Sequence, residues 1–222
     1  MNRQALRQFE GSTPWFVLDT AQPPIPTIGT GHACPTFQHV LAIPAAYWAV
    51  PARDLAAVLT SDWHAIQQAT GGHTAAGYQY YTQARLTPEG MGKLEDDDVR
   101  RVCSALYTAY PWLLALHLPT SWQDAVEDMA FNLGPTFLGG WPKLRGYLRA
   151  RDPVGCQREC VRILSPTPPG SRETKQEEYE RNAQLVRNKW TQQQFALPYS
   201  ISTTVTSDND TTAPTTTERQ VP

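Results

Sequence analysis

The segments FEGSTPWFVLDT, residues 9–20, and PTIGTGH, residues 26–32, hold most of what is distinctive in this chain. A polar segment before Gly11 carries apolar side chains on one side, which predicts a short helix over residues 2–10. An apolar run follows, then a turn rich in proline, then a run punctuated by glycine. This order predicts a helix and a β-hairpin, whose return strand covers residues 27–33.

Two carboxylates flank the first strand of this hairpin. Glu10 closes the predicted helix, and Asp19 follows nine residues later at the end of the apolar run. Thr27 stands at the start of the return strand, and His32 stands near its end. Two carboxylates joined by a hairpin are the minimum needed to hydrolyse a glycosidic bond, because one donates a proton while the other stabilises positive charge or orients a water molecule.

The two carboxylates would need different surroundings for such chemistry. A carboxylic acid donates a proton only if it is still protonated at the working pH, and partial burial favours that form. We expect Phe9 and Trp15 to shield Glu10 in this way. We expect Asp19 to stay ionised.

The remainder of the chain is predicted to be mainly helical. Thr87-Pro88-Glu89 is a typical helix start, with a capping threonine, a proline and an acid in the first turn. Asp54, the capping box that begins at Ser121, and Asp152 are expected to cap three more helices. The predicted helices cover residues 54–70, 87–106, 121–133, 141–149, 152–164 and 174–195.

The last predicted helix carries two patterns. Tyr179 begins an apolar series at helical spacing that includes Val186 and Trp190, which predicts the buried face. Arg181 and Arg187 belong to the same helix. Either arginine could pair with Glu10, or both could lie on a solvated face of the helix.

Composition argues against several classes of partner. The chain has 222 residues, of which 41% are hydrophobic, and a formal net charge of -2. That charge provides no field for binding nucleic acid or an anionic membrane, and the longest apolar runs are too short to span a bilayer. Residues 1–8, MNRQALRQ, lack the apolar segment of a signal peptide. We therefore expect the protein to be made and kept in the cytosol unless something else releases it.

The four cysteines are too few and too scattered for a disulfide scaffold. Cys156 and Cys160 stand one helical turn apart, but no matching pair of Cys or His completes a metal site. We therefore expect buried, reduced thiols, and neither a metal nor another cofactor.

Six short motifs, taken in chain order, resemble the phage-type lysozymes, the muramidases of glycoside hydrolase family 24. They are Glu10-Gly11, Asp19-Thr20, Thr27–His32, Leu86–Glu89 with Asp98-Val99, Ala125-Val126 with Ala130–Gly134, and Leu185–Arg187. The resemblance is strong at the N-terminus and around Phe131, and weaker between. The chain departs from the family in three places. Its hairpin turn is two residues longer, and the roughly 50 residues between His32 and Leu86 are more than the compact members of the family carry. Trp141–Leu144 replaces a Ser-Thr-Leu-type segment.

The resemblance implies an α+β, lysozyme-like fold over residues 1–198. A small hairpin lobe would cover about residues 10–85 and a larger helical lobe about residues 86–198, with a long helix joining them. Residues 199–222 are rich in Ser and Thr and are predicted to be a tail that is flexible or bound to a partner.

The implied activity is hydrolysis, with inversion, of the β-1,4 bond between N-acetylmuramic acid and N-acetylglucosamine in bacterial peptidoglycan. The catalytic residues implied by the resemblance are Glu10, Asp19 and Thr27. The residues implied to line the substrate groove or support it are His32, Phe131 and Asn132. For His32 we favour ordering of the hairpin by hydrogen bonding over proton transfer. Glu10 would be the acid, with the other two catalytic residues holding the attacking water.

The implied setting is a phage endolysin, held in the host cytoplasm until lysis, or a lysozyme mounted on a virion through phage proteins that contact the tail. Two other classes stay open. One is an inactive structural or wall-binding component of a phage particle that keeps the lysozyme fold. The other is a zinc amidase or peptidase that uses His32, His64, His73 or Cys34, although none of these forms a pair at metalloprotease spacing.

Overall fold

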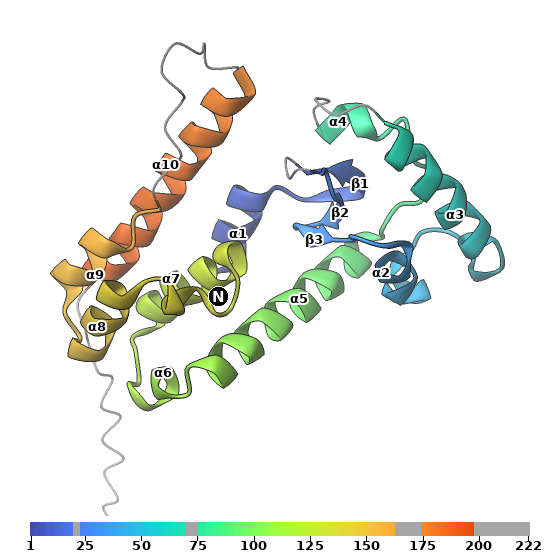
Figure 1. The fold of residues 1–222 in the computed structure, drawn as a ribbon. Helices are drawn as coiled ribbons and strands as arrows, with labels where there is room; N and C mark the ends of the chain where they lie inside the picture. Colours follow the sequence, from blue (N-terminus) through green and yellow to red (C-terminus); the bar gives the residue numbers. More distant parts are fainter. Residues whose placement is uncertain (20–22, 70–74, 163–174, 198–222) are drawn as a thin grey trace, which may run out of the picture.

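The computed structural model describes residues 1–19, 23–69, 75–162 and 175–197. These residues form a mostly helical structure with one small antiparallel sheet, which confirms the α+β class (Figure 1). The elements in chain order are α1 (Arg3–Glu10), β1 (Thr13–Leu18), β2 (Pro26–Gly29), β3 (His32–Ala33), α2 (Phe37–Ala42), η1 (Ala45–Tyr47), α3 (Ala52–Gln68), α4 (Ala75–Tyr78), α5 (Pro88–Ala109), α6 (Trp112–Ala115), α7 (Thr120–Leu133), η2 (Phe137–Gly139), α8 (Pro142–Ala150), α9 (Pro153–Glu159) and α10 (Lys175–Ala196).

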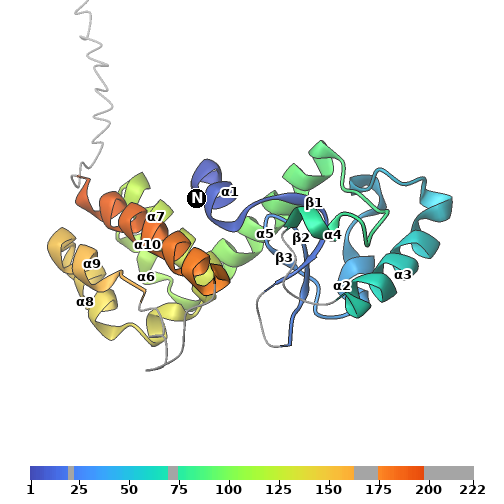
Figure 2. The same ribbon diagram turned by 90° about the horizontal axis from the view of Figure 1, so that it is seen from above.

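Two hydrophobic cores share helix α5. The sheet core gathers side chains from the sheet, α2, α3 and the start of α5, with Phe16 and Ile66 fully buried and Leu94 as its contribution from α5. The helical core surrounds α7 and includes Val102 and Leu106 from the second half of α5. Helix α5 therefore crosses the molecule between two groups of elements, and α1 lies between those groups (Figure 1). Seen from above, α10 runs beside α7 and α9, away from the sheet (Figure 2).

The hairpin contains one more strand than the sequence predicted. Strands β1 and β2 pair antiparallel, with Val17 opposite Thr27, and β2 pairs in turn with the short β3. Gly29 and Gly31 have φ of 65° and 77°, a region that glycine enters without steric cost. The chain therefore reverses between them, and the single return strand expected over residues 27–33 is wrong.

Several helix starts were predicted correctly. The Thr87 side chain accepts a hydrogen bond from the Gly90 N–H at 2.9 Å, and Asp152 accepts one from Gly155 at 3.0 Å. At the start of the chain, Asn2 accepts from the Ala5 N–H. These bonds satisfy amide groups that have no partner inside the helix.

Two predicted caps are wrong because a proline stands before each helix. Helix α3 follows Pro51, so Asp54 lies inside the first turn. Helix α7 follows Pro119, so Ser121 also lies inside the helix and no side chain caps its start. The extended backbone of each proline, with φ of -55°, sets the start one to three residues earlier than the polar residue suggested.

The remaining helices differ mainly in extent. The predicted helix 152–164 is shorter, since α9 ends at Glu159. Helices α2 and α4 and the turn η1 were not predicted, and they occupy the proline-marked and tyrosine-rich stretches. The tail over residues 199–222 and the glycine pair at 71–72 lie outside the described residues.

Over the ranges that are described, no helix has both the length and the apolar character needed to cross a membrane.

The prediction of buried thiols is confirmed for three of the four cysteines, and Cys103 is partly buried. All four are free, and Cys34, Cys156 and Cys160 are buried. Burial raises the pKa of each of these three thiols to about 12, because the charged thiolate is poorly solvated there. They therefore act as small apolar side chains within the two cores.

We expect alanine substitutions at two glycines near the start of α5 to change the free energy of unfolding in opposite directions. A Cβ at Gly90 would overlap the backbone of Tyr47, whereas a Cβ at Gly92 would meet no atom within 4 Å. Gly90→Ala should therefore lower the free energy of unfolding by about 1–3 kcal/mol through overpacking. Gly92→Ala should raise it by up to about 1 kcal/mol, because alanine favours a helix. Urea unfolding measures both, and equal changes would contradict the close contact of α5 with η1.

Candidate active site

Glu10 lies where three segments of the chain meet. Its side chain, at the end of α1, is 22% exposed. A Cβ built on Gly31 would stand 3.7 Å from Glu10 Oε2 and 3.9 Å from Phe131 Cε1. The turn between β2 and β3 and the end of α7 therefore both border the Glu10 carboxylate.

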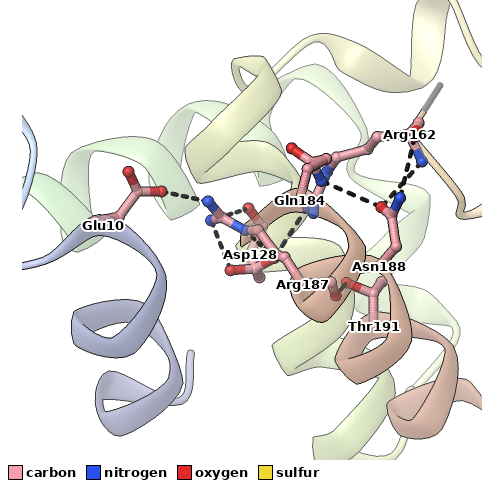
Figure 3. Close-up of polar contacts among 7 residues, drawn as sticks. All are labelled: Glu10, Asp128, Arg162, Gln184, Arg187, Asn188 and Thr191. Carbon is pink, nitrogen blue, oxygen red and sulfur yellow. Dashed lines mark hydrogen bonds and ion pairs between the residues drawn. The ribbon is translucent and has the colours of Figure 1, made fainter. Parts of the chain in front are cut away.

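Helix α10 supplies a cation to the same carboxylate. Arg187 Nη1 donates to Glu10 Oε1 at 2.5 Å (Figure 3). The guanidinium also lies over the ring of Phe9, 5.3 Å from its centre. Of the two arginines considered from the sequence, Arg187 makes this pair, whereas Arg181 lies on the exposed side of α10. Glu10 thus carries an ion pair in addition to its apolar neighbours.

Arg187 belongs to a buried ionic cluster between α7 and α10. Its Nη2 and Nε donate to the two carboxylate oxygens of Asp128 at 2.8 Å and 3.0 Å, and Arg162 donates to the same carboxylate at 3.0 Å (Figure 3). The Asn188 side chain bonds both the N–H and the C=O of Arg162. Two guanidinium groups and two carboxylates therefore balance in charge, which a buried cluster requires.

Burial and charge act on the two arginines with different results. Burial alone would lower the pKa of Arg187, but its bonds to Asp128 and its pair with Glu10 outweigh burial and raise that pKa above the ordinary value. For Arg162 burial dominates, and its pKa is lowered despite the pair with Asp128. Arg187 is therefore held firmly as a cation beside Glu10.

The buried face of α10 differs from the apolar face that the sequence predicted. Val186 is 52% exposed, whereas Arg187 and Asn188 are buried, as is Thr191, which donates to the Arg187 carbonyl at 2.9 Å. Trp190 is half-buried and packs edge-on against Phe9. The apolar spacing missed this face, because its polar side chains are buried with hydrogen-bond partners that the spacing does not reveal.

Asp19 and Thr27 lie on the hairpin, Asp19 directly after β1 and Thr27 within β2. Asp19 Oδ1 accepts from the Ile25 N–H at 2.7 Å, and the Asp19 N–H donates to the Ile25 carbonyl at 3.0 Å. Alternation along β2 sends Ile28 into the sheet core and leaves Thr27 partly exposed on the other face. The Thr27 hydroxyl contacts the Val17 carbonyl at 3.4 Å, a long and weak hydrogen bond.

His32 connects the hairpin to α5. Its Nδ1 lies 2.8 Å from Asp98 Oδ2, and Arg101 donates to the other oxygen of Asp98 at 2.9 Å. Burial raises the pKa of the Asp98 carboxyl, but the hydrogen bonds and charges of His32 and Arg101 outweigh it and lower that pKa overall. This geometry agrees with the hairpin-ordering role expected for His32.

The other expected site residues are placed unevenly. Phe131 is half-buried against the helical core and borders Glu10, whereas Asn132 is exposed beside it at the end of α7. Trp15 points elsewhere, since its indole N–H donates to the Ala75 carbonyl at 2.8 Å and Arg85 lies over its ring. The expectation that Trp15 shields Glu10 is therefore wrong, and Gly31 and Phe131 fill that place.

Metal binding was considered from the histidines and Cys34. In the described ranges, no group of three or more His, Cys, Asp or Glu side chains is arranged to hold a metal ion. His73 lies outside these ranges.

Comparison with known proteins adds nothing to this geometry. No protein-family model matches the chain, and no curated protein matches it.

Loss of Arg187 should destabilise the protein strongly. Arg187→Met leaves Glu10 and Asp128 without their shared cation, and we expect the free energy of unfolding to fall by about 3 kcal/mol. Lys189→Met, on the exposed side of the same helix, should change it by less than about 0.5 kcal/mol. Urea unfolding of both variants gives the comparison, and a similar small loss for both would contradict the buried cluster.

The ionised Asp98 carboxylate should stabilise the folded protein, and this stabilisation should be lost at acidic pH. Because the folded-state pKa is lowered, the stabilisation is complete above about pH 4 and is lost as the pH falls through the folded-state pKa. We expect Asp98→Asn to cost about 2 kcal/mol at neutral pH and progressively less on acidification. Unfolding measured from pH 7 to pH 2 tests this, and a difference independent of pH would contradict it.

Proposed function

We propose that this protein is a muramidase that hydrolyses the β-1,4 bond between N-acetylmuramic acid and N-acetylglucosamine in bacterial peptidoglycan. The observation that carries the proposal is the position of Glu10, bordered by Gly31, Phe131 and Arg187 from three other segments. The resemblance of the N-terminal motifs to phage-type lysozymes supports the same reading. Two cores that share one long helix are compatible with a lysozyme-like arrangement of two lobes.

Glu10 serves as the general acid in this proposal. It must carry a proton when the glycosidic bond breaks, and its pair with Arg187 must then be given up. Arg187 keeps two hydrogen bonds to the Asp128 carboxylate when Glu10 becomes neutral, and Arg162 shares that carboxylate. The cluster then holds two guanidinium groups against one carboxylate, which favours the return of Glu10 to its charged form once the proton has been donated.

Asp19 and Thr27 hold the attacking water in this proposal. The Ile25 N–H fixes the Asp19 carboxylate, and the long bond between Thr27 and Val17 leaves the threonine hydroxyl able to turn toward a water molecule. Inversion requires roughly 6.5–9.5 Å between the two carboxyl groups, so that water fits between Asp19 and the sugar. The chemistry needs no cofactor.

The biological setting follows from the substrate. Peptidoglycan is the partner, and the protein acts either as an endolysin released from the host cytoplasm or as a lysozyme carried on a virion. In the second setting, residues 199–222 would bind a phage structural protein.

Substitution of the acid tests the proposal directly. Glu10→Gln preserves the shape but removes the proton, so release of reducing sugar from purified peptidoglycan should fall at least about 100-fold. Glu89→Gln, the same change at an exposed position of α5, should leave the rate unchanged. Reducing ends and free amino groups are measured in parallel.

The outcomes separate the candidate classes. Clearing of peptidoglycan at the same slow rate by wild type and Glu10→Gln would overturn the enzyme proposal, and co-sedimentation with the wall would then favour a binding or structural component. Release of amino groups that stops with EDTA would favour a zinc amidase. Neither result is expected.

A further inference from the structure

We propose that Glu95 is a positioning residue that holds both sides of the Glu10 site in place. This inference rests on the proposed function for its catalytic consequence, but its geometry stands independently. Glu95 lies on α5 and is 4% exposed, although the sequence marks it only as one acid in a run of four. A buried carboxylate is costly unless it is paired, so its partners indicate what it does.

Its first group of partners belongs to α1. Arg7 donates to both Glu95 oxygens, from Nε at 2.8 Å and from Nη2 at 3.1 Å, in a bidentate pair. Arg3 donates to the Glu95 carbonyl at 3.0 Å and pairs with Asp96 at 2.8 Å. Arg7 stands three residues before Glu10, so this pair fixes the last turn of the helix that presents the acid.

Its second partner belongs to the hairpin. The Thr30 hydroxyl, 4% exposed, donates to Glu95 Oε2 at 2.9 Å. The next residue, Gly31, is the one that borders the Glu10 side chain. One carboxylate oxygen thus joins α1 through Arg7 to the β2–β3 turn through Thr30.

Open space adjoins the Glu95 contacts with α1. A cavity of about 470 Å³ opens beside them, lined by nine residues that include Arg7, Ser12, Met91 and Glu95. The Ser12 hydroxyl lies 3.3 Å from the Thr30 hydroxyl, at the connection between α1 and β1. Because open space adjoins this connection, the polar bonds of Glu95 set the distance between Glu10 and the turn.

The test uses kinetics on peptidoglycan with the full chain. Glu95→Gln keeps the shape but loses the bidentate ion pair, and Thr30→Val loses only the hydroxyl donor. Both should lower kcat by about 10- to 100-fold while KM changes less than about 3-fold, because a displaced acid impairs the chemical step more than binding. Thr30→Ser, which retains the hydroxyl, should restore kcat to near the wild-type value.

A matched control separates positioning from stability. Asp62 is equally buried but accepts backbone hydrogen bonds from Gln83 and Ala84, within the sheet core. Asp62→Asn should lower the free energy of unfolding and leave kcat per folded molecule unchanged. Wild-type kcat in Glu95→Gln, measured well below its unfolding temperature, would overturn the inference.

A second measurement keeps the inference testable if the wild type does not hydrolyse peptidoglycan. That result would reject the proposed function alone. Amide hydrogen exchange over residues 29–33 should then still be at least about 10-fold faster in Glu95→Gln than in wild type, and in Asp62→Asn it should match wild type. Unchanged exchange in Glu95→Gln would overturn the positioning role.

Discussion

A single buried carboxylate, Asp128, determines how the last helix packs. It lies on α7, 2% exposed, and receives hydrogen bonds from Arg187 and Arg162. A charge buried in this way has to be neutralised, and only the polar face of α10 with the Arg162 segment supplies cations to it among the described residues. The orientation of α10, and with it the cation beside Glu10, follows from that requirement.

The same physical rule operates at two places on α5. Glu95 joins α1 to the hairpin turn, and Asp98 joins the hairpin to α5 through His32. Each acid binds at least one donor that is 65 or more residues away in the sequence. Buried carboxylates therefore connect α5 to α1 and to the hairpin near Glu10, whereas apolar side chains make up the two cores.

Local signals in the sequence account for what could be predicted. Thr87 and Asp152 cap their helices through bonds to residues three positions away, and such bonds depend on nearby sequence only. Asp54 and Ser121 have the same local appearance, but a preceding proline begins each helix earlier. The return strand was predicted too long because Gly29 and Gly31 reverse the chain.

The candidate site was predictable only in part. Glu10, Asp19, Thr27 and His32 were named as candidates because their spacing resembles a known family. Asp128, Arg162 and Glu95 were missed, because their roles depend on partners in distant segments and no local pattern identifies a paired acid. Arg187 was one of two candidates, and only the packing of α10 distinguishes it from Arg181.

The pair between Arg187 and Glu10 joins residues that are 177 positions apart. During synthesis, therefore, the carboxylate of α1 is made 177 residues before its cation, which follows nearly all the side chains of both cores. A nascent chain can form the hairpin and α5 while Glu10 still faces water. The charge balance around Glu10 is complete only when α10 packs against α1 and α7.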